Sequence, residues 1–383
     1  MLGTRLRSSA GRLFRRAIEV VPIDLELTPP APAIQGVPTS NAVFLGPTAS
    51  GPLDTPTLVT SMVDYERTFG VPGSDDTGLS VRLFFLNGGR RAHVVRTNDV
   101  EGSGLPSLAS VDFVNLVCVP GTAGMTAAGA AAMVGSVAGF CEEQRAFYVV
   151  DPPGSLTPAD ITAWKDDLEP TANAAVYAPG VQVDDPANPG QLRDVPPSGA
   201  VAGVIARTDI ERGVWATPAG LTAGAVQGVR GVTATLTESD SERLNTAGIC
   251  ALRNVPGRGL RVWGARTLAA AEAPEWKYVS VRRLFLFVEE SLGRGTQWAV
   301  FEPNDERLWQ TIRTSIENFL LDLFQSGALV GRTPQDAYFV RCDRMTMTQD
   351  DIDNGRLVCV VGIAPVRPAE FVEFRTTWSL VQP

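Results

Sequence analysis

The residue types that could carry acid–base or nucleophilic chemistry are few in this chain. His93 is the only histidine among 383 residues, and a serine–histidine–aspartate site would have to use it. The alternation of side chains over residues 90–95 predicts that His93 lies in a β-strand. No serine stands in a Gly-x-Ser-x-Gly turn. These observations favour a structural histidine over a catalytic one.

Three short patterns resemble ligand or catalytic motifs, and each has a plainer explanation. The acidic run 350–355 resembles part of an EF-hand loop, but Ile352 occupies a position where calcium needs an oxygen ligand. The glycines of residues 257–259 lack the third glycine and the lysine of a phosphate-binding loop. Glu289 and Glu290 are neighbours on a predicted helix, where adjacent side chains point about 100° apart. We therefore expect a solvated turn, a tight turn and a pair of surface charges.

The cysteines are five in number, widely spaced and set mostly in apolar, strand-like segments. No Cys-x-x-Cys pair occurs, so the sequence indicates neither a zinc site nor a redox motif. We expect buried, reduced thiols in a cytoplasmic protein, and no metal or other cofactor. The five residues are Cys118, Cys141, Cys250, Cys342 and Cys359.

The overall composition is that of a folded protein with more than one domain. Hydrophobic residues make up 44% and charged residues 20% of the chain, whose length is enough for two or three domains. The net charge of −9 argues against a protein that coats nucleic acid or an anionic membrane. No apolar run is long enough to predict a membrane span. Residues 1–18 are rich in arginine and contain no acid, and we expect a solvated arm rather than a membrane-surface helix.

Periodicity indicates the elements that would position these residues. Residues 22–56 are rich in proline and predict an extended connector with a short strand at 42–46. Residues 111–265 alternate between strands and helices, which predicts an α/β layer with a largely parallel sheet. Thr157 is a predicted helix N-cap, with Pro158 at the first helical position. The expected strands are 92–96, 111–119, 147–150 and 174–177, and the expected helices are 61–69, 127–144, 199–210 and 239–247, with a loop at 178–198.

The C-terminal part changes character to amphipathic helices followed by a small sheet. Apolar residues from 278 to 292 recur at helical spacing. A second, longer helix is expected to begin after Asn304 as its cap and to end at Gly327. Two strands are predicted at 338–344 and 356–365.

A series of motifs, all in the same order, resembles the tail sheath family of contractile phages and related injection systems. The resemblance covers roughly residues 34–378 and is densest from Trp263 onward. Its motifs are residues 36–40, 69–70, 195–199, 209–215, 244–249, 256–259, 263–298, 301–305, 339–343, 353–357 and 364–371.

The resemblance implies an α/β fold class. It implies a subtilisin-like α/β middle domain and an α+β C-terminal sheath domain, whose small sheet is completed by terminal arms of neighbouring subunits. No protease triad accompanies that fold here, since the chain has a single histidine. The implied divisions are an N-terminal arm or linker at 1–33, the N-terminal part of the sheath core at 34–100, the middle domain at 101–262, the C-terminal sheath domain at 263–369 and a C-terminal arm at 370–383.

The implied arms would explain an extended, alternating segment at 371–381 that has no obvious partner strand of its own. An exposed sheet edge can accept a strand from another chain. The inter-subunit N-terminal arm would use Ile18, Val20, Val21, Ile23, Leu25 and Leu27, and the C-terminal arm would use Phe371, Val372, Phe374, Trp378 and Leu380. The receiving strands would carry Tyr338, Val340, Cys342, Leu357, Cys359 and Val361.

The implied function is that of a structural sheath subunit and not of an enzyme. Such subunits form a helical sheath of six-fold rings around an inner tube, and contraction drives the tube through a target envelope. The implied partners are further copies of the chain, the inner tube protein, and baseplate and terminator or cap proteins, without nucleic acid or a membrane span. Assembly would occur in the cytoplasm, as part of a phage tail or phage-tail-like particle. The alternatives are another structural tail or baseplate component and a degenerate subtilisin-like hydrolase.

Overall fold

The computed structural model describes residues 31–73, 75–98 and 104–369. All elements named below belong to the compact unit Pro32–Pro383. Residues 18–27 and 371–380, which hold the expected arm positions, lie outside the described part of the chain. The described part has a mixed α/β architecture with several sheets.

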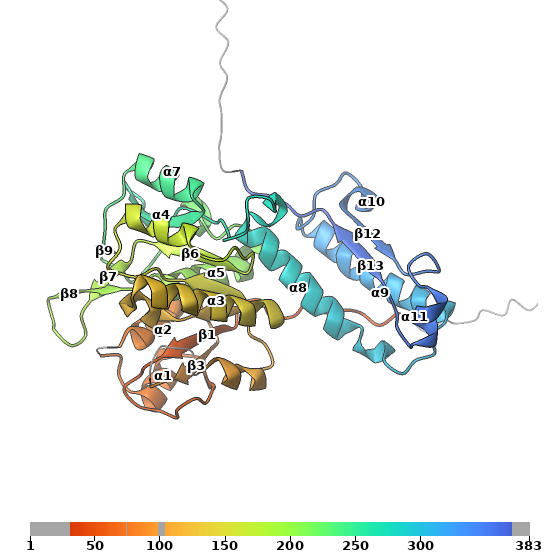
Figure 1. Ribbon diagram of the computed structural model, residues 1–383, viewed down its shortest axis with the longest axis horizontal. Helices are drawn as coiled ribbons and strands as arrows, with labels where there is room; N and C mark the ends of the chain where they lie inside the picture. Colours follow the sequence, from red (N-terminus) through yellow and green to blue (C-terminus); the bar gives the residue numbers. More distant parts are fainter. Residues whose placement is uncertain (1–30, 74, 99–103, 370–383) are drawn as a thin grey trace, which may run out of the picture. The chain divides into compact units, whose positions relative to one another are not determined.

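An eight-stranded sheet in the order β11-β10-β6-β5-β4-β1-β3-β2 forms the larger body (Figure 1). Neighbouring strands from β10 to β3 are parallel, whereas β11 and β2 add antiparallel edges. The predicted largely parallel sheet is thereby confirmed. The strands are β1 (Ala42–Gly46), β2 (Thr57–Val59), β3 (Ala92–Arg96), β4 (Leu116–Cys118), β5 (Phe147–Val150), β6 (Ala174–Ala178), β10 (Ile249–Val255) and β11 (Gly259–Val262).

Helices cover both faces of this sheet, so its central strands are buried on both sides (Figure 1). In β1, Ala42 and Phe44 belong to one apolar layer and Val43 and Leu45 to the other, because successive strand side chains point to opposite faces. The first layer includes α1 (Met62–Phe69), α2 (Asp76–Leu86) and α5 (Ser198–Arg212), and the second includes α3 (Ala127–Glu143), α4 (Pro158–Asp166) and α7 (Glu238–Thr246).

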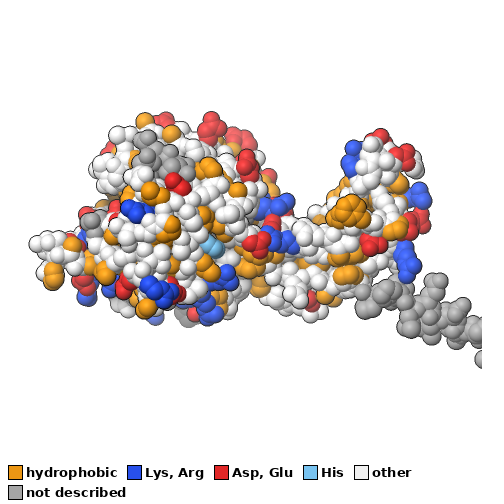
Figure 2. All heavy atoms as spheres, turned by 90° about the horizontal axis from the view of Figure 1, so that it is seen from below, with side chains coloured by type: hydrophobic (Ala, Val, Ile, Leu, Met, Phe, Trp, Pro, Cys, Tyr) orange, Lys and Arg blue, Asp and Glu red, His pale blue; other side chains and the backbone are white. Residues whose placement is uncertain are grey.

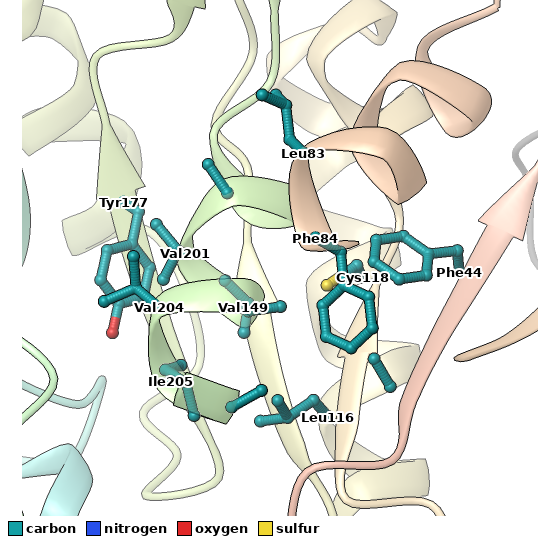
Figure 3. Close-up of a cluster of buried hydrophobic side chains, with 14 of the residues drawn as sticks. Phe44, Leu83, Phe84, Leu116, Cys118, Val149, Tyr177, Val201, Val204 and Ile205 are labelled. Atoms are coloured by element: carbon teal, nitrogen blue, oxygen red, sulfur yellow. The ribbon is translucent and has the colours of Figure 1, made fainter. Parts of the chain in front are cut away.

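Helix α5 is built largely from small residues because it lies against both the sheet and α2. Figure 3 shows its side chains Val201, Val204 and Ile205 beside the core of the sheet. A Cβ atom at Gly199 would lie 2.2 Å from the Ser80 carbonyl oxygen, and one at Gly203 would lie 2.5 Å from that of Phe84. Real Cβ atoms do not approach so closely, so α5 needs glycine at both crossings.

Replacing Gly199 by alanine is therefore expected to destabilise the fold by about 1–3 kcal/mol, since the added methyl group must displace backbone in a close-packed layer. Urea denaturation followed by circular dichroism measures this change. Gly135→Ala is the matched control, because Gly135 lies in α3 and, apart from the local backbone of α3 itself and its two chain neighbours, no atom lies within 4 Å of the place that its new methyl group would take. That control should be neutral or stabilising, and an equal loss in both variants would contradict the packing explanation.

The C-terminal part packs two long helices against a two-stranded antiparallel sheet (Figure 1). Leu284 and Val288 on the first helix share an apolar cluster with Trp309, Ile312 and the rest of the buried stripe of the second. The elements are α8 (Val279–Gly295), α9 (Glu306–Gln325), α10 (Pro334–Ala337), β12 (Tyr338–Arg341), α11 (Gln349–Asp353) and β13 (Val360–Ile363).

Several predicted elements differ from the observed ones. The expected loop at 178–198 contains a hairpin, β7 (Val181–Asp184) and β8 (Leu192–Val195), which pairs with β9 (Gly231–Val232) in a third sheet. The long strand expected at 111–119 is paired only at β4, because 3-10 turns flank it. The remaining elements are α6 (Gly220–Ala223) and the 3-10 turns η1 (Leu105–Ser110), η2 (Pro120–Gly124), η3 (Pro274–Trp276) and η4 (Gln297–Ala299).

Two helix caps also differ in detail. Asp305, and not Asn304, caps α9, because its carboxylate accepts a hydrogen bond from the Leu308 amide at 2.9 Å. Asn304 instead accepts a hydrogen bond from the Trp309 indole at 2.7 Å. The predicted cap of α4 is confirmed, with Thr157 in a complete capping box.

Candidate assembly surface

An apolar groove of about 680 Å³ runs along β13 in the C-terminal part. Its lining comes from two separate stretches of the chain, residues 292–316 and 355–361, and includes none of the residues of β12. Strand β12 pairs with one side of β13, and β13 has a second side away from β12. Within residues 31–369 as described, no strand pairs with this side. The lining residues are Leu292, Gly293, Thr296, Ala299, Val300, Phe301, Glu302, Asn304, Leu308, Ile312, Ile316, Gly355, Leu357, Cys359 and Val361.

Phe301 stands at this groove with its side chain in solvent. Its relative exposure is 102%, and its neighbour Val300 is 61% exposed. The backbone of Phe301 has φ 72°, a left-handed conformation that is rare for a bulky residue. Hydrophobic side chains are visible at the surface of the C-terminal part, at the right of Figure 2. Exposed apolar grooves of this kind are typical of interaction sites for proteins or ligands.

The expected receiving residues lie together on one side of the small sheet. Tyr338 and Val340 lie in β12 and Val361 lies in β13, whereas Cys342, Leu357 and Cys359 lie outside these strands, which are shorter than the predicted 338–344 and 356–365. All six belong to, or pack against, the apolar cluster over α8 and α9. Of the six, the groove is lined by Leu357, Cys359 and Val361. Sequence periodicity indicated these strand positions but not Phe301, whose significance depends on three-dimensional exposure.

A buried ion pair ties the helix beneath this surface to the α/β layer. Arg283 of α8 donates two hydrogen bonds of 2.7 Å to the two carboxylate oxygens of Asp209 of α5. It also donates to the Thr39 carbonyl at 2.7 Å. The two charged side chains are only 4% and 3% exposed. Because both charged side chains are buried, each charge is stabilised by its partner, and removal of one partner would leave the other charge uncompensated.

A second, solvent-exposed set of ion pairs joins the same two parts. Arg294 donates to Asp112 at 2.8 Å and lies over the Phe113 ring at 3.9 Å from its centroid. Arg145 donates to Glu290 at 3.0 Å. Glu289 and Glu290, the adjacent acids considered in the sequence analysis, are therefore both partners of Arg145 in ion pairs near the surface. Each exposed ion pair of this kind contributes little to the free energy of unfolding.

His93 and the buried Ser198 lie on different, non-adjacent strands or their flanks and are not brought together. His93 lies in β3 opposite Val43 and Leu58, and burial, reinforced by Arg91, lowers the pKa of its imidazole. Ser198 begins α5 beside β4, which is separated from β3 by β1. The structure therefore assigns His93 to the sheet and not to a catalytic group.

Asp151 lies fully buried at the start of α5 and caps that helix from outside. Its Oδ1 accepts a hydrogen bond from the Ser198 amide at 2.8 Å, whereas Pro197 at the N-cap offers no side-chain cap. Its Oδ2 has no hydrogen-bond partner in the described part of the chain. Burial raises the pKa of Asp151 to about 8, against the lowering effect of the Ser198 hydrogen bonds.

The stability of the fold should consequently decrease as pH rises. An aspartate in the unfolded chain titrates near pH ~3.9, so between this pH and about 8 the folded state holds a proton that the unfolded state lacks. The contribution of Asp151 to the free energy of unfolding is fully present below the pKa of the unfolded chain. It should fall by about 1.4 kcal/mol per pH unit between that pKa and the pKa of the folded state. Asp151→Asn, which keeps a cap oxygen, should remove this slope in denaturation series from pH 5 to 8. The exposed-site control Asp167→Asn should retain it, and identical slopes in wild type and Asp151→Asn would contradict the assignment.

The acidic run considered for calcium forms part of a short helix. Thr348 caps α11 in a capping box, and hydrogen bonds from Thr348 lower the pKa of Asp351 to about 2. Arg356 donates to Asp350 at 2.6 Å and to Asp351 at 2.9 Å. Over the described residues, no cluster of three or more histidine, cysteine or acidic side chains could hold a metal ion. None of the helices within that same part is long and apolar enough to cross a membrane.

Comparison with known proteins gives a consistent picture. The family profile described as phage tail sheath protein central domain matches residues 105–268, and that of the phage tail sheath C-terminal domain matches residues 271–379. The tail sheath protein of Vibrio phage KVP40 is 26% identical over 58% of this chain and 35% of that protein. The curated relatives are matched over only 26–59% of their own length.

Solved structures of contractile sheaths are similar to nearly the full length of this chain. The sheath complex of an extracellular contractile injection system, PVC, in its contracted state is 32% identical, with a TM-score of 0.79 over 98% of this chain and 99% of that one. The contracted helical sheath of the anti-feeding prophage is 29% identical, with a TM-score of 0.76 over 97% and 99%. The chain belongs to the contractile tail sheath family. Its relatives are structural sheath proteins and not enzymes.

Proposed function

We propose that this chain polymerises as the sheath around an inner tube and contracts to drive that tube through a target envelope. The observation that supports the proposal is a C-terminal sheet of only two strands among the described residues, next to an apolar groove of about 680 Å³ that is lined in part by residues 355–361. A folded monomer that exposes such a surface requires a partner to cover it.

The terminal arms of neighbouring copies are the segments that complete this sheet. Residues 371–381 alternate in a strand-like manner and are long enough to run beside the seven residues from 357 to 363. Each added backbone hydrogen bond contributes only about 0.5–1.5 kcal/mol. The sum over an arm, repeated through an array, can keep subunits connected while their globular parts reorient. Residues 18–27 would form the second arm, with Pro22 at an edge or bend.

The wider assembly follows from the same proposal. Six-fold rings of this chain would stack on a baseplate and end at a terminator or cap protein, inside the cytoplasm where the particle is made. We retain the five divisions inferred from sequence, at 1–33, 34–100, 101–262, 263–369 and 370–383. The subtilisin-like description of the middle domain is supported by its parallel strands β4, β5, β6 and β10 and by the buried helix α5, although β1, β2 and β3 from residues 34–100 belong to the same sheet.

Electron microscopy of the purified chain tests this function. We expect tubes of uniform diameter to form from the full chain alone. Deleting residues 370–383 should leave a folded monomer by circular dichroism that no longer polymerises. Normal tubes from this truncation would refute the arm assignment. A full chain that stays monomeric and is found in a few copies at the end of particles would favour a baseplate component instead.

A further inference from the structure

Two cysteines flank the paired residues at one end of the small C-terminal sheet: Cys342 follows β12 and Cys359 precedes β13. The antiparallel register pairs Tyr338 with Ile363 and, at the other end, Arg341 with Val360. If this register continues for one step beyond the paired residues, Cys342 stands opposite Cys359, and the two thiols do interact with each other. Directly opposed residues of antiparallel strands have Cα atoms ~4.5–5.5 Å apart. This spacing falls inside the range of ~4.4–6.8 Å that a disulfide bridges.

The two side chains also share a face and a chemical environment. Both belong to the apolar cluster over α9, where Cys342 is 3% exposed and Cys359 is partly exposed. The interaction of the two sulfurs lowers the pKa of the Cys342 thiol and raises that of Cys359, with Arg313 adding to the lowering at Cys342. The pair therefore yields one thiolate more readily than an isolated buried cysteine does.

The three other cysteines lack this arrangement. Cys118 and Cys141 are fully buried on opposite layers of the α/β body, and burial raises the pKa of each thiol. The Cys250 sulfur is held 3.2 Å from the backbone nitrogen and oxygen of Arg266. All five cysteines are unbridged in the structure, but only Cys359 lines the groove, where a small molecule can approach.

We propose that Cys342 and Cys359 are a modification site for low-molecular-weight disulfides, such as oxidised glutathione, and form a reversible cross-strand disulfide. One sulfur of the pair, as a thiolate, attacks the glutathione disulfide and releases one glutathione thiolate. The second cysteine then attacks the mixed disulfide and releases the other. Two protein thiols are oxidised, one glutathione disulfide is reduced to two thiols, and the two protons lost by the cysteines pass to the leaving thiolates.

The closed disulfide would staple β12 to β13 around the connection 343–358. This connection is already ordered by α11 and by the ion pairs from Arg356 to Asp350 and Asp351. If the sheet receives an arm, the disulfide would hold β12 and β13 in a fixed register and so keep β13 in place for the incoming strand. That consequence rests on the proposed function, whereas formation of the disulfide does not.

Peptide mapping of the full-length, unassembled chain tests the proposal. The protein is incubated with oxidised glutathione, its remaining thiols are alkylated in denaturant, and it is digested with trypsin. We expect alkylation to be lost at two of the five cysteines. We also expect the tryptic peptide 342–344 to be covalently joined to the peptide that begins at Leu357, and released from it by dithiothreitol.

Matched variants make the result specific. Cys342→Ser and Cys359→Ser should each abolish the linked peptide, whereas Cys118→Ser should preserve it. Full alkylation of both cysteines in a natively folded chain, a glutathione adduct without the cross-link, or a different pairing would overturn the proposal. Tubes without the disulfide would count against the staple alone, and the disulfide without tubes would count against the sheath function alone.

Discussion

Replacing Arg283 by alanine is expected to destabilise the chain by about 3–5 kcal/mol, because removal of one partner leaves a buried charge uncompensated. Asp209, which is only 3% exposed in the wild-type chain, would lose both of its 2.7 Å hydrogen bonds. The Thr39 carbonyl would lose its donor as well. This loss is a large fraction of the net stability of a folded protein, so the variant should unfold at much lower urea concentration.

A double replacement separates the charge effect from simple loss of packing. Arg283→Met combined with Asp209→Leu removes both charges and keeps apolar volume between α8 and α5, so it should recover most of the lost stability. Urea denaturation of the three proteins measures the difference. If Arg283→Ala lowers the free energy of unfolding by less than about 1 kcal/mol, as loss of an exposed ion pair would, the buried ion pair is not what joins α8 to the α/β layer.

Replacing Phe301 by aspartate is expected to abolish polymerisation while leaving the monomer folded. The side chain is fully exposed, so it contributes no packing within the monomer. Its left-handed backbone is better tolerated by aspartate than by phenylalanine. A carboxylate at the apolar groove would have to be desolvated when a neighbouring strand covers it, which costs several kcal/mol per interface.

Met345→Asp is the matched control for this surface. Met345 is 92% exposed in the same C-terminal part but does not line the groove. Sedimentation and electron microscopy should show tubes for Met345→Asp and monomers for Phe301→Asp, with equal urea midpoints. Tubes of normal length and yield from Phe301→Asp would show that the groove is not an assembly surface.

Local patterns predicted the elements whose stabilisation is local. The continuous apolar run of β5 and the capping box of α4 lie within single short segments, and both are observed as expected. The hairpin β7–β8 was missed because a polar connection, 185–191, interrupts two short strands. The helix α11 was missed because an acidic run that ends in Asn-Gly is typical of a turn, although Thr348 and Asp351 form a capping box.

The groove could not be predicted from the sequence, because its walls come from segments far apart in the chain. Residues of α8, the connection 296–304, α9 and the strand segment 355–361 each contribute to its lining. Helical periodicity correctly indicated that α8 and α9 have apolar faces, but it could not show that part of those faces stays uncovered. The resemblance implied a sheet that is completed by neighbouring arms, and this stays a prediction; the structure shows a two-stranded sheet among the described residues and the groove beside it.

The most direct test of the central claim is a cryo-EM map of tubes assembled from the full-length chain. We expect an extended strand of residues 371–380 from another copy to lie beside β13 and to cover Phe301. A lattice in which this side of β13 stays empty, or is filled by the same subunit's own C-terminal residues, would contradict the claim that neighbouring subunits complete the sheet.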